Sequence, residues 1–475
     1  MKEESHEKLI QSNISDLKIN ITTRTNECEN ENEAHTPKEE TKIELTPYRY
    51  VIVIIYFLLN FINGMHWVTF ASCAAKFGKF YHLNNFLVDL FSLIFMILYP
   101  LVCVPEAYIV DNISMKKGLI ISALLLIIGS LLKIFINVTI VLAYVGQFLT
   151  ALFQPAILNS PGKIAATWFN EKSRTLVTSI CCVSNTIGIM AGYLIHSLVI
   201  AENIVNPIIW RDFFFKYLLI EFIITLIFCL LFIFLMRNKP KNPPSLSKDN
   251  YTIMPLKEGI KQLKSNPDFI KLLISLTCVV GFVNIFGTIF NSYMDLYKIN
   301  DIMATYTAAV SNCFGIVTAL IVGCFIDKKK QYKSVMIICN ILALVFLIIT
   351  LMLLETGDKK IIGRAAFFGY TLVLGSAIPI YTAGMDFICE ITYPVGESIS
   401  EGIVMSFNQI MGIIGIIISD CFRIYLKKMK YMTNLFSVLL FFISLTSLYF
   451  TNPELKRTQK DLKEIKEENK EKEDN

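Results

Sequence analysis

Long apolar runs recur along nearly the whole chain, and each is long enough to cross a bilayer as a helix. A span needs roughly 20 apolar residues, and we count about six such runs on each side of residues 237–267. The prolines and lysines of that middle stretch, RNKPKNPPSLSKDNYTIMPLKEGIKQLKSNP, belong in water. With 54% hydrophobic and only 17% charged residues, the chain is too apolar for a soluble protein. The sequence predicts an all-α membrane protein with twelve transmembrane helices in two six-helix bundles.

Polar interruptions of the apolar runs give the boundaries of the spans. We place them at Tyr50–Ala75, Asp89–Val110, Gly118–Ile136, Thr139–Ser160, Thr175–Ile200, Phe213–Met236, Phe269–Asp295, Ile302–Ile326, Ser334–Leu354, Ile362–Cys389, Ile399–Tyr425 and Tyr431–Phe450. The bundles then occupy residues 48–236 and 268–451, and the linker carries one short surface helix near Leu256–Leu263. Residues 1–47 lack the apolar surface for a core, so we expect a disordered tail. Residues 452–475 are expected to form a charged, solvated tail.

The distribution of lysine and arginine predicts the orientation. An even number of spans puts both tails on one side, and most basic loop residues share that side. They include Lys116, Lys117, Lys163, Lys172, Arg174, Lys328, Lys329, Lys330 and Lys333. Basic loops mark the cytoplasmic face, so we expect both tails in the cytoplasm. We expect a monomer in the plasma membrane rather than in an organelle membrane.

A motif that follows the second span recurs after the eighth. The first copy reads YIVDNISMKKGLIIS, and the second reads CFIDKKKQYKSVMII. One interpretation is that any cytoplasmic loop is basic; the other is an internal duplication, which the recurring aspartate favours. Asp111 and Asp327 would lie near helix ends, where they can pair with lysines or accept backbone N–H bonds. We predict that Asp111 with Lys117, and Asp327 with Lys329, act as latches between helix ends.

Four stretches, in order along the chain, resemble the feline leukaemia virus subgroup C receptor family of the major facilitator superfamily. They read NGMHWVTF, GQFLTALFQPAILNSPGKIAATWFN, GCFIDKKKQYK and CEITYPVGESISEG. The resemblance covers about residues 48–449. It implies the major facilitator fold and a carrier of small organic solutes, since members of that family are associated with choline and ethanolamine transport and with haem export.

Four side chains are candidates for binding the solute. Trp67 would lie past the middle of the first span, where it either packs against a neighbouring helix or offers its indole face to a quaternary ammonium group. The resemblance places Gln154 and Gln409 in the central cavity, although an isolated glutamine often only bonds a neighbouring helix. Asn284 stands where that family has a tyrosine of its aromatic cage. An asparagine offers no π face, so the position bears on specificity.

Two acidic side chains in the tenth span are further candidates. Asp386 and Glu390 are one helical turn apart and share a face, where they could attract a cation or carry a proton. Pairing of Glu390 with Lys163 or Arg174 is the structural alternative. Metal-spaced histidine clusters, phosphate loops and nucleophile elbows are absent from the sequence, so we expect no enzyme, no metal and no cofactor. The basic residues form no face for nucleic acid.

These patterns predict a carrier that works by alternating access and holds its solute with Trp67, Gln154, Asn284 and Gln409. The first hypothesis is uniport of a choline-like or ethanolamine-like cation, driven by the membrane potential. Export of haem or transport of an organic anion is one alternative. A membrane receptor or scaffold that transports nothing is the other. Membrane lipid and one small solute are the expected partners.

Overall fold

The computed structural model describes residues 47–83, 85–199, 206–240, 254–299, 301–356, 359–421, 429–460 and 463. Within these ranges the regular elements are all helices. Twelve helical segments are long and apolar enough to cross a membrane, so the prediction of twelve transmembrane helices is confirmed. The predicted tail at residues 1–46 and the end of the C-terminal tail lie outside the described residues.

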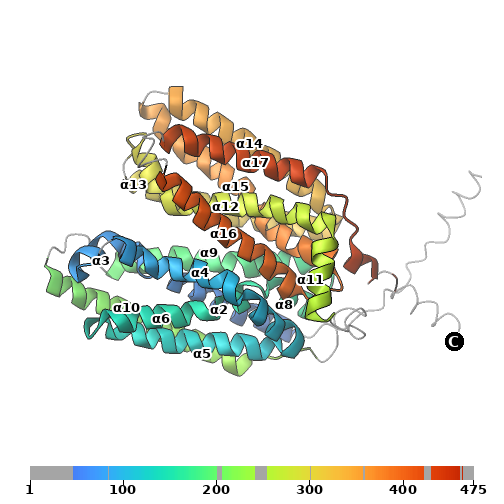
Figure 1. The fold of residues 1–475 in the computed structure, drawn as a ribbon, viewed down its shortest axis with the longest axis horizontal. Helices are drawn as coiled ribbons and strands as arrows, with labels where there is room; N and C mark the ends of the chain where they lie inside the picture. Colours follow the sequence, from blue (N-terminus) through green and yellow to red (C-terminus); the bar gives the residue numbers. More distant parts are fainter. Residues whose placement is uncertain are drawn as a thin grey trace, which may run out of the picture. The chain divides into compact units, whose positions relative to one another are not determined.

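Figure 1 shows the spans in two groups, blue to green and yellow to red. The first group consists of α2 (Tyr48–Val68), α4 (Asn85–Tyr108), α5 (Met115–Ile134), α6 (Ile140–Leu152) with α7 (Gln154–Leu158), α9 (Arg174–Val199) and α10 (Pro207–Leu235). The second consists of α12 (Pro267–Asp295), α13 (Asp301–Lys329), α14 (Tyr332–Thr356), α15 (Lys359–Thr392), α16 (Glu397–Cys421) and α17 (Met429–Tyr449). Shorter helices are η1 (Ala71–Cys73), α3 (Ala74–Tyr81), η2 (Ile109–Ile113), η3 (Phe135–Asn137), α8 (Pro161–Trp168) and α11 (Leu256–Ser265).

The helix contacts of the first bundle repeat in the second. In the first, α2 packs on α9 and α10, α5 packs on α6 and α10, and α4 packs on α6. In the second, α12 packs on α16 and α17, α14 packs on α15 and α17, and α13 packs on α15. Counted by span, the two sets are identical. This repetition of contacts supports the internal duplication that the recurring aspartate motif indicates.

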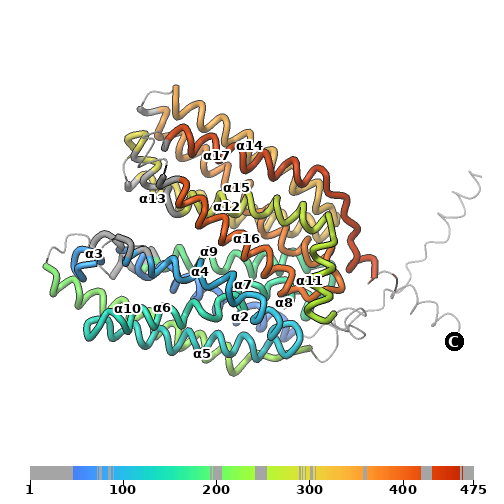
Figure 2. The backbone as a smooth tube through the Cα atoms, in the orientation of Figure 1, coloured from blue at the N-terminus to red at the C-terminus, as the bar shows by residue number. Residues whose placement is uncertain are grey.

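The most extensive contacts between the bundles are made by two helix pairs that correspond under the same duplication. The second span, α4, packs on the eleventh, α16, and the fifth, α9, packs on the eighth, α13. We call the end of the bundles where α11 lies the linker side and the opposite end the far side. Figure 2 shows α11 crossing the ends of the bundle helices there, and it matches the predicted surface helix of the linker.

Asn-Pro pairs begin two of the spans. Asn206 precedes Pro207 of α10, and its side chain accepts a hydrogen bond from the backbone N–H of Ile208 at 2.9 Å. Asn266 does the same before α12, bonding Asp268 at 3.1 Å and Phe269 at 3.2 Å. An asparagine cap satisfies amides that have no partner in the first turn, and proline is tolerated there because its missing N–H is not needed.

The fourth span is broken where the sequence predicts one helix. Helix α6 ends at Leu152 and α7 begins at Gln154, because Pro155 has no N–H to continue the ladder. Two side chains bond the freed backbone groups. Ser122 donates to the carbonyl of Phe153 at 3.0 Å, and the Glu106 carboxylate accepts from the amide of Ala156 at 3.0 Å. These bonds explain how an irregular backbone is tolerated inside the bundle.

Candidate functional site

Asp111 joins the two bundles on the linker side. It lies in η2, directly after α4, and its carboxylate accepts backbone N–H bonds from Ser398 at 3.3 Å and Ile399 at 3.0 Å. These amides form the first turn of α16, where the helix dipole favours a negative charge. Lys163 of α8 completes the site, with its Nζ 2.9 Å from Asp111 Oδ1. Burial alone would lower the pKa of Lys163. The charges of Asp111 and Glu397 raise it by a larger amount, so the pKa lies above the ordinary value.

Asp327 makes the equivalent contact from the other bundle. It lies near the end of α13 and accepts from the amides of Thr175 at 2.9 Å and Leu176 at 2.8 Å, in the first turn of α9. Lys330 Nζ is 3.7 Å from Asp327 Oδ1. The predicted latch aspartates therefore each cap a helix of the opposite bundle.

The lysines differ from those that the sequence indicates. Lys117 and Lys329 are exposed, and the cations beside the two carboxylates are Lys163 and Lys330. Lys117 follows Asp111 closely in sequence, but it lies on α5, where only its backbone amide takes part in the N-terminal cap, bonding Ser114. Lys163 lies on α8, 52 residues away from Asp111 in the sequence, and its ammonium contacts the carboxylate.

A third carboxylate crosses between the bundles. Glu401 of α16 accepts from the amide of Gly162, in the first turn of α8, at 3.0 Å. A Cβ at Gly162 would lie within 3 Å of Cys389 Sγ and would collide with Glu401, so only glycine permits this approach. We call the contacts of Asp111, Asp327 and Glu401 with helix N-termini the linker-side latch.

Asp386 and Glu390 lie within this latch rather than in an open central site. Asp386 accepts from Thr175 Oγ1 at 2.7 Å and from Tyr332 Oη at 2.6 Å. Glu390 is 3.6 Å from the guanidinium of Arg174, so the structural alternative for this residue is the one observed. Both carboxylates are buried and contact the first bundle. Their sequence-based assignment as a substrate or proton site has no support from these contacts.

Part of the predicted solvated tail packs onto the same place. Residues 451–460, which we call the C-terminal strap, place Arg457 at 3% exposure, where its charge interacts electrostatically with those of Glu390 and Glu397. Thr458 bonds Glu390 Oε2 through its amide at 3.1 Å and its hydroxyl at 2.9 Å. Burial alone would lower the pKa of Arg457. The two glutamates raise it by a larger amount, so the guanidinium stays charged. For Arg457 and Thr458 the prediction of a solvated segment is wrong, because nearby buried acids attract the guanidinium, whereas Asn452, Glu454, Lys456 and Gln459 are exposed.

Removing the Arg457 charge should destabilise the protein. We expect Arg457→Gln to lower the melting temperature of the purified protein, since loss of one partner from a buried charge cluster costs about 3 kcal/mol. The matched control is Lys456→Gln, the same change of charge at the exposed neighbouring position. Thermal unfolding in detergent measures both. Equal shifts for the two variants would show that Arg457 adds nothing beyond surface charge.

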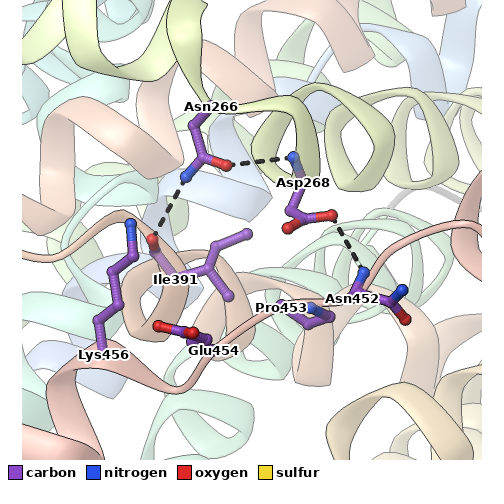
Figure 3. Close-up of a pocket in the computed structure, with 7 residues that line it drawn as sticks. All are labelled: Asn266, Asp268, Ile391, Asn452, Pro453, Glu454 and Lys456. Carbon is purple, nitrogen blue, oxygen red and sulfur yellow. Dashed lines mark hydrogen bonds between the residues drawn. The ribbon is translucent and has the colours of Figure 1, made fainter.

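A polar crevice lies where the strap crosses the start of α12 (Figure 3). Its lining residues are Asn266, Asp268, Ile391, Asn452, Pro453, Glu454 and Lys456. Asn266 donates to the carbonyl of Ile391 at 3.4 Å, and Asp268 accepts from the amide of Asn452 at 3.0 Å. These polar groups hold the strap against the bundle, so we assign the crevice to anchoring rather than to the solute.

Two candidate solute residues lie where the bundles approach each other. A Cβ at Gly412 of α16 would lie 2.9 Å from Met96 Cε of α4 and 3.4 Å from Asn284 Cβ of α12. Asn284 is partly exposed, and its Cβ lies beside Gly412 at this junction. Gln409 is also partly exposed and lies three residues before Gly412, on the same face of α16. The structure thus brings Asn284 and the helix face that carries Gln409 to the boundary between bundles.

Trp67 and Gln154 lie at the ends of helical segments. Trp67 is in the last turn of α2, because the helix ends at Val68 instead of continuing to Ala75 as predicted. The Thr69 hydroxyl donates to the Glu221 carboxylate at this end, at 2.6 Å. Trp67 is partly exposed, and its buried Nε1 has no hydrogen-bond partner among the described residues. Gln154 begins α7, and its Oε1 also lacks a described partner.

Sequence reasoning missed a cluster in which side chains of the two bundles meet. Its members are Tyr99, Cys103, Leu158, Cys182, Met385 and Met405, with the partly buried Tyr381 packed against them. Five helices from both bundles contribute, so the cluster fills the boundary with apolar and aromatic side chains. The individual residues carry no motif, and only their convergence distinguishes them from other apolar positions.

Comparisons with known proteins agree with this architecture. The sequence model of the Major Facilitator Superfamily matches residues 52–419. The structure of the transporter FucP in the outward conformation superposes with a TM-score of 0.68 at 14% identity, covering 86% of this chain and 100% of that one. At this identity the similarity concerns the fold.

Two curated proteins are similar in sequence over most of the chain. Solute carrier family 49 member A3 of Xenopus tropicalis is 26% identical over 383 residues, 78% of this chain and 77% of that protein. The choline/ethanolamine transporter flvcr2a of Danio rerio is 28% identical over 378 residues, 77% of this chain and 78% of that protein.

Proposed function

Because the chain belongs to the major facilitator superfamily, we propose that it carries a choline-like or ethanolamine-like cation across the membrane by alternating access. The proposal rests on the chemistry of the four candidate side chains. Trp67, Gln154, Asn284 and Gln409 are all uncharged, whereas Asp111, Asp327, Asp386, Glu390 and Glu401 take part in the latch. An indole face and amide oxygens suit a cation that carries its own charge and few hydrogen-bond donors.

The absence of charge from these four side chains is the observation that carries this proposal, and two of them also have uncommitted polar atoms. A buried polar atom without a partner costs free energy, and it persists where a ligand or water completes it. The Nε1 of Trp67 and the Oε1 of Gln154 are two such atoms. The similarity to a choline/ethanolamine transporter agrees with this solute class.

In this proposal the structure represents the state closed on the linker side, which we assign to the cytoplasm. The hydrogen bonds from Asp111, Asp327 and Glu401 hold that side together. Release of these bonds would let the bundles rock and open the site to the cytoplasm. We propose that Asp111 and Asp327, with Lys163 and Lys330, are the gating residues, and that both tails lie in the cytoplasm of a plasma-membrane protein.

Uptake into proteoliposomes tests the cation uniport. A monovalent cation gains about 2.3 kcal/mol per 100 mV, which corresponds to roughly 50-fold accumulation without a coupling ion. We expect choline or ethanolamine uptake to rise when a potassium gradient and valinomycin set an inside-negative potential. Liposomes without protein are the control. Flux that ignores the potential, or that carries only neutral or anionic solutes, would contradict the proposal.

Restoring an aromatic ring at position 284 should strengthen cation binding. Asn284 lies at the junction of the bundles but offers no π face. We expect Asn284→Tyr to lower the KM for choline about 5-fold, since a cation–π contact contributes about 1 kcal/mol. Asn284→Leu is the matched control, because it removes the amide without adding a π face. Equal KM values for the two variants would place the solute elsewhere.

A further inference from the structure

Three ionisable side chains meet inside the first bundle, apart from the linker-side latch. They are His66 of α2, Lys133 of α5 and Glu221 of α10, and their exposures are 0%, 0% and 1%. His66 Nδ1 is 2.7 Å from Lys133 Nζ and 3.2 Å from Glu221 Oε1. Lys133 Nζ is 3.6 Å from Glu221 Oε2. We call these three residues the buried triad.

The neighbouring helices supply neutral polar groups to the triad. Gln147 of α6 donates to the backbone carbonyl of His66 at 3.1 Å, and Thr69 donates to Glu221 Oε1 at 2.6 Å. Among the described residues, Lys133 and Glu221 are the charged groups that contact the imidazole. A lysine and a glutamate balance each other, so the charge of the triad depends on whether His66 carries a second proton.

The hydrogen-bond pattern identifies which nitrogen of His66 can gain that proton. Thr225 Oγ1 donates its single hydrogen to the carbonyl of Glu221 at 2.7 Å. The Lys133 ammonium has no lone pair, so at 2.7 Å it donates to His66 Nδ1, and the hydrogen of the neutral ring then lies on Nε2, 2.9 Å from Thr225 Oγ1. Nε2 carries a hydrogen in either charge state, and Nδ1 is the atom that gains or loses the proton.

We propose that His66 Nδ1 is a proton-binding site whose occupancy changes the position of Lys133 and of the end of α2. Without the proton, Nδ1 accepts an N–H from the Lys133 ammonium. With the proton, Nδ1 donates to Glu221 Oε1. Two N–H groups cannot face each other at the observed 2.7 Å, so Lys133 must then move away from the ring. The ligand is one proton, and its binding breaks no covalent bond.

The triad is connected to Trp67 through the end of α2. Thr69, two residues after Trp67, bonds the Glu221 carboxylate and lies 3.5 Å from Lys133 Nζ. The stem of Lys133 packs tightly on α6, since a Cβ at Gly146 would lie 2.8 Å from Lys133 Cγ. Only the ammonium end of the Lys133 side chain can therefore move, and this end lies beside Thr69 and His66. Proton binding should alter the surroundings of the Trp67 indole.

The fluorescence of Trp67 can report this proton directly. The chain has three tryptophans, so Trp168→Phe with Trp210→Phe leaves Trp67 as the only one. In this background we expect its emission to change in one transition as the pH falls and His66 gains its second proton. His66→Gln should abolish the transition. The exposed His82 is the matched control, and His82→Asn should retain it, since asparagine tolerates its left-handed backbone.

A second variant keeps the test decisive if His66→Gln does not fold. Thr225→Val keeps the shape of the side chain but removes the acceptor for Nε2–H, and we expect the midpoint to move about one pH unit toward acid. A transition that persists in His66→Gln, an unchanged midpoint in Thr225→Val, or no transition in the parent would overturn the site. None of these measurements uses a solute. If vesicles take up no choline while the Trp67 fluorescence still shows the transition that depends on His66, the proposed function is contradicted and the proton site is retained.

Discussion

Replacing Asp111 with asparagine is expected to open the linker side of the protein. The carboxylate receives the Lys163 ammonium and two amides of α16, and Lys163 is only 8% exposed. Without the negative charge, a buried cation loses its partner, at a cost of about 3–5 kcal/mol to the closed state. A loss of about 3 kcal/mol corresponds to a population of the open state roughly 100-fold higher. Hydrogen–deuterium exchange should therefore rise at the amides of Ser398 and Ile399.

The duplication supplies an internal comparison for this experiment. If both latch aspartates hold one gate, Asp111→Asn should also increase exchange at Thr175 and Leu176, although their acceptor Asp327 is unchanged. Asp327→Asn should give the mirror-image result. Asp212→Asn is the matched control, because Asp212 pairs with Lys216 on an exposed helix face. Exchange that rises only beside the substituted aspartate would mean that each carboxylate caps its helix and controls no gate.

The latch aspartates could be found from the sequence because two features repeat at equivalent positions. An aspartate at a helix end followed by a basic cluster occurs once in each half, and its chemistry suits a helix N-terminus. The cation beside each carboxylate could not be found in the same way. Lys117 is near Asp111 along the chain, whereas Lys163 is near it in space, and only the packing of α8 decides between them.

The acidic residues of the tenth span also show that the sequence does not identify the partners of a charged side chain. Their spacing correctly predicts a shared face for Asp386 and Glu390, but spacing does not say what that face contacts. Arg174 lies in the first bundle and Thr458 follows the last span, and both contact Glu390. The charged residues after the last span predict a solvated tail by composition, and the buried acids reverse that preference for Arg457.

The buried triad shows why long-range charge pairing escapes a reading of single spans. Lys133 lies near the end of an apolar run, where lysine normally extends toward the membrane surface. Glu221 lies within a run, and its partner is not apparent from the sequence. The two belong to the third and sixth spans, and the contact between α5 and α10 brings them together with His66.

Replacing Trp67 with alanine should cause the largest loss of transport among the candidate solute residues. The indole is partly exposed, and its Nε1 has no described partner, so alanine breaks no described side-chain hydrogen bond. A desolvated cation–π contact contributes about 2 kcal/mol, which predicts a roughly 30-fold lower kcat/KM for choline uptake. Trp67→Phe keeps a smaller π face and should retain intermediate activity.

The order of these variants separates a cation from the alternative solutes. If the indole binds a cation, uptake should fall from tryptophan to phenylalanine to alanine, and choline should compete more weakly in the same order. An organic anion gains nothing from a π face, so its flux should not follow this order. Trp168→Phe is the matched control, because this buried tryptophan packs against Tyr48 at the linker-side end. Equal uptake by Trp67→Ala and the parent protein would remove Trp67 from the site, and with it the main physical reason for choosing a cation.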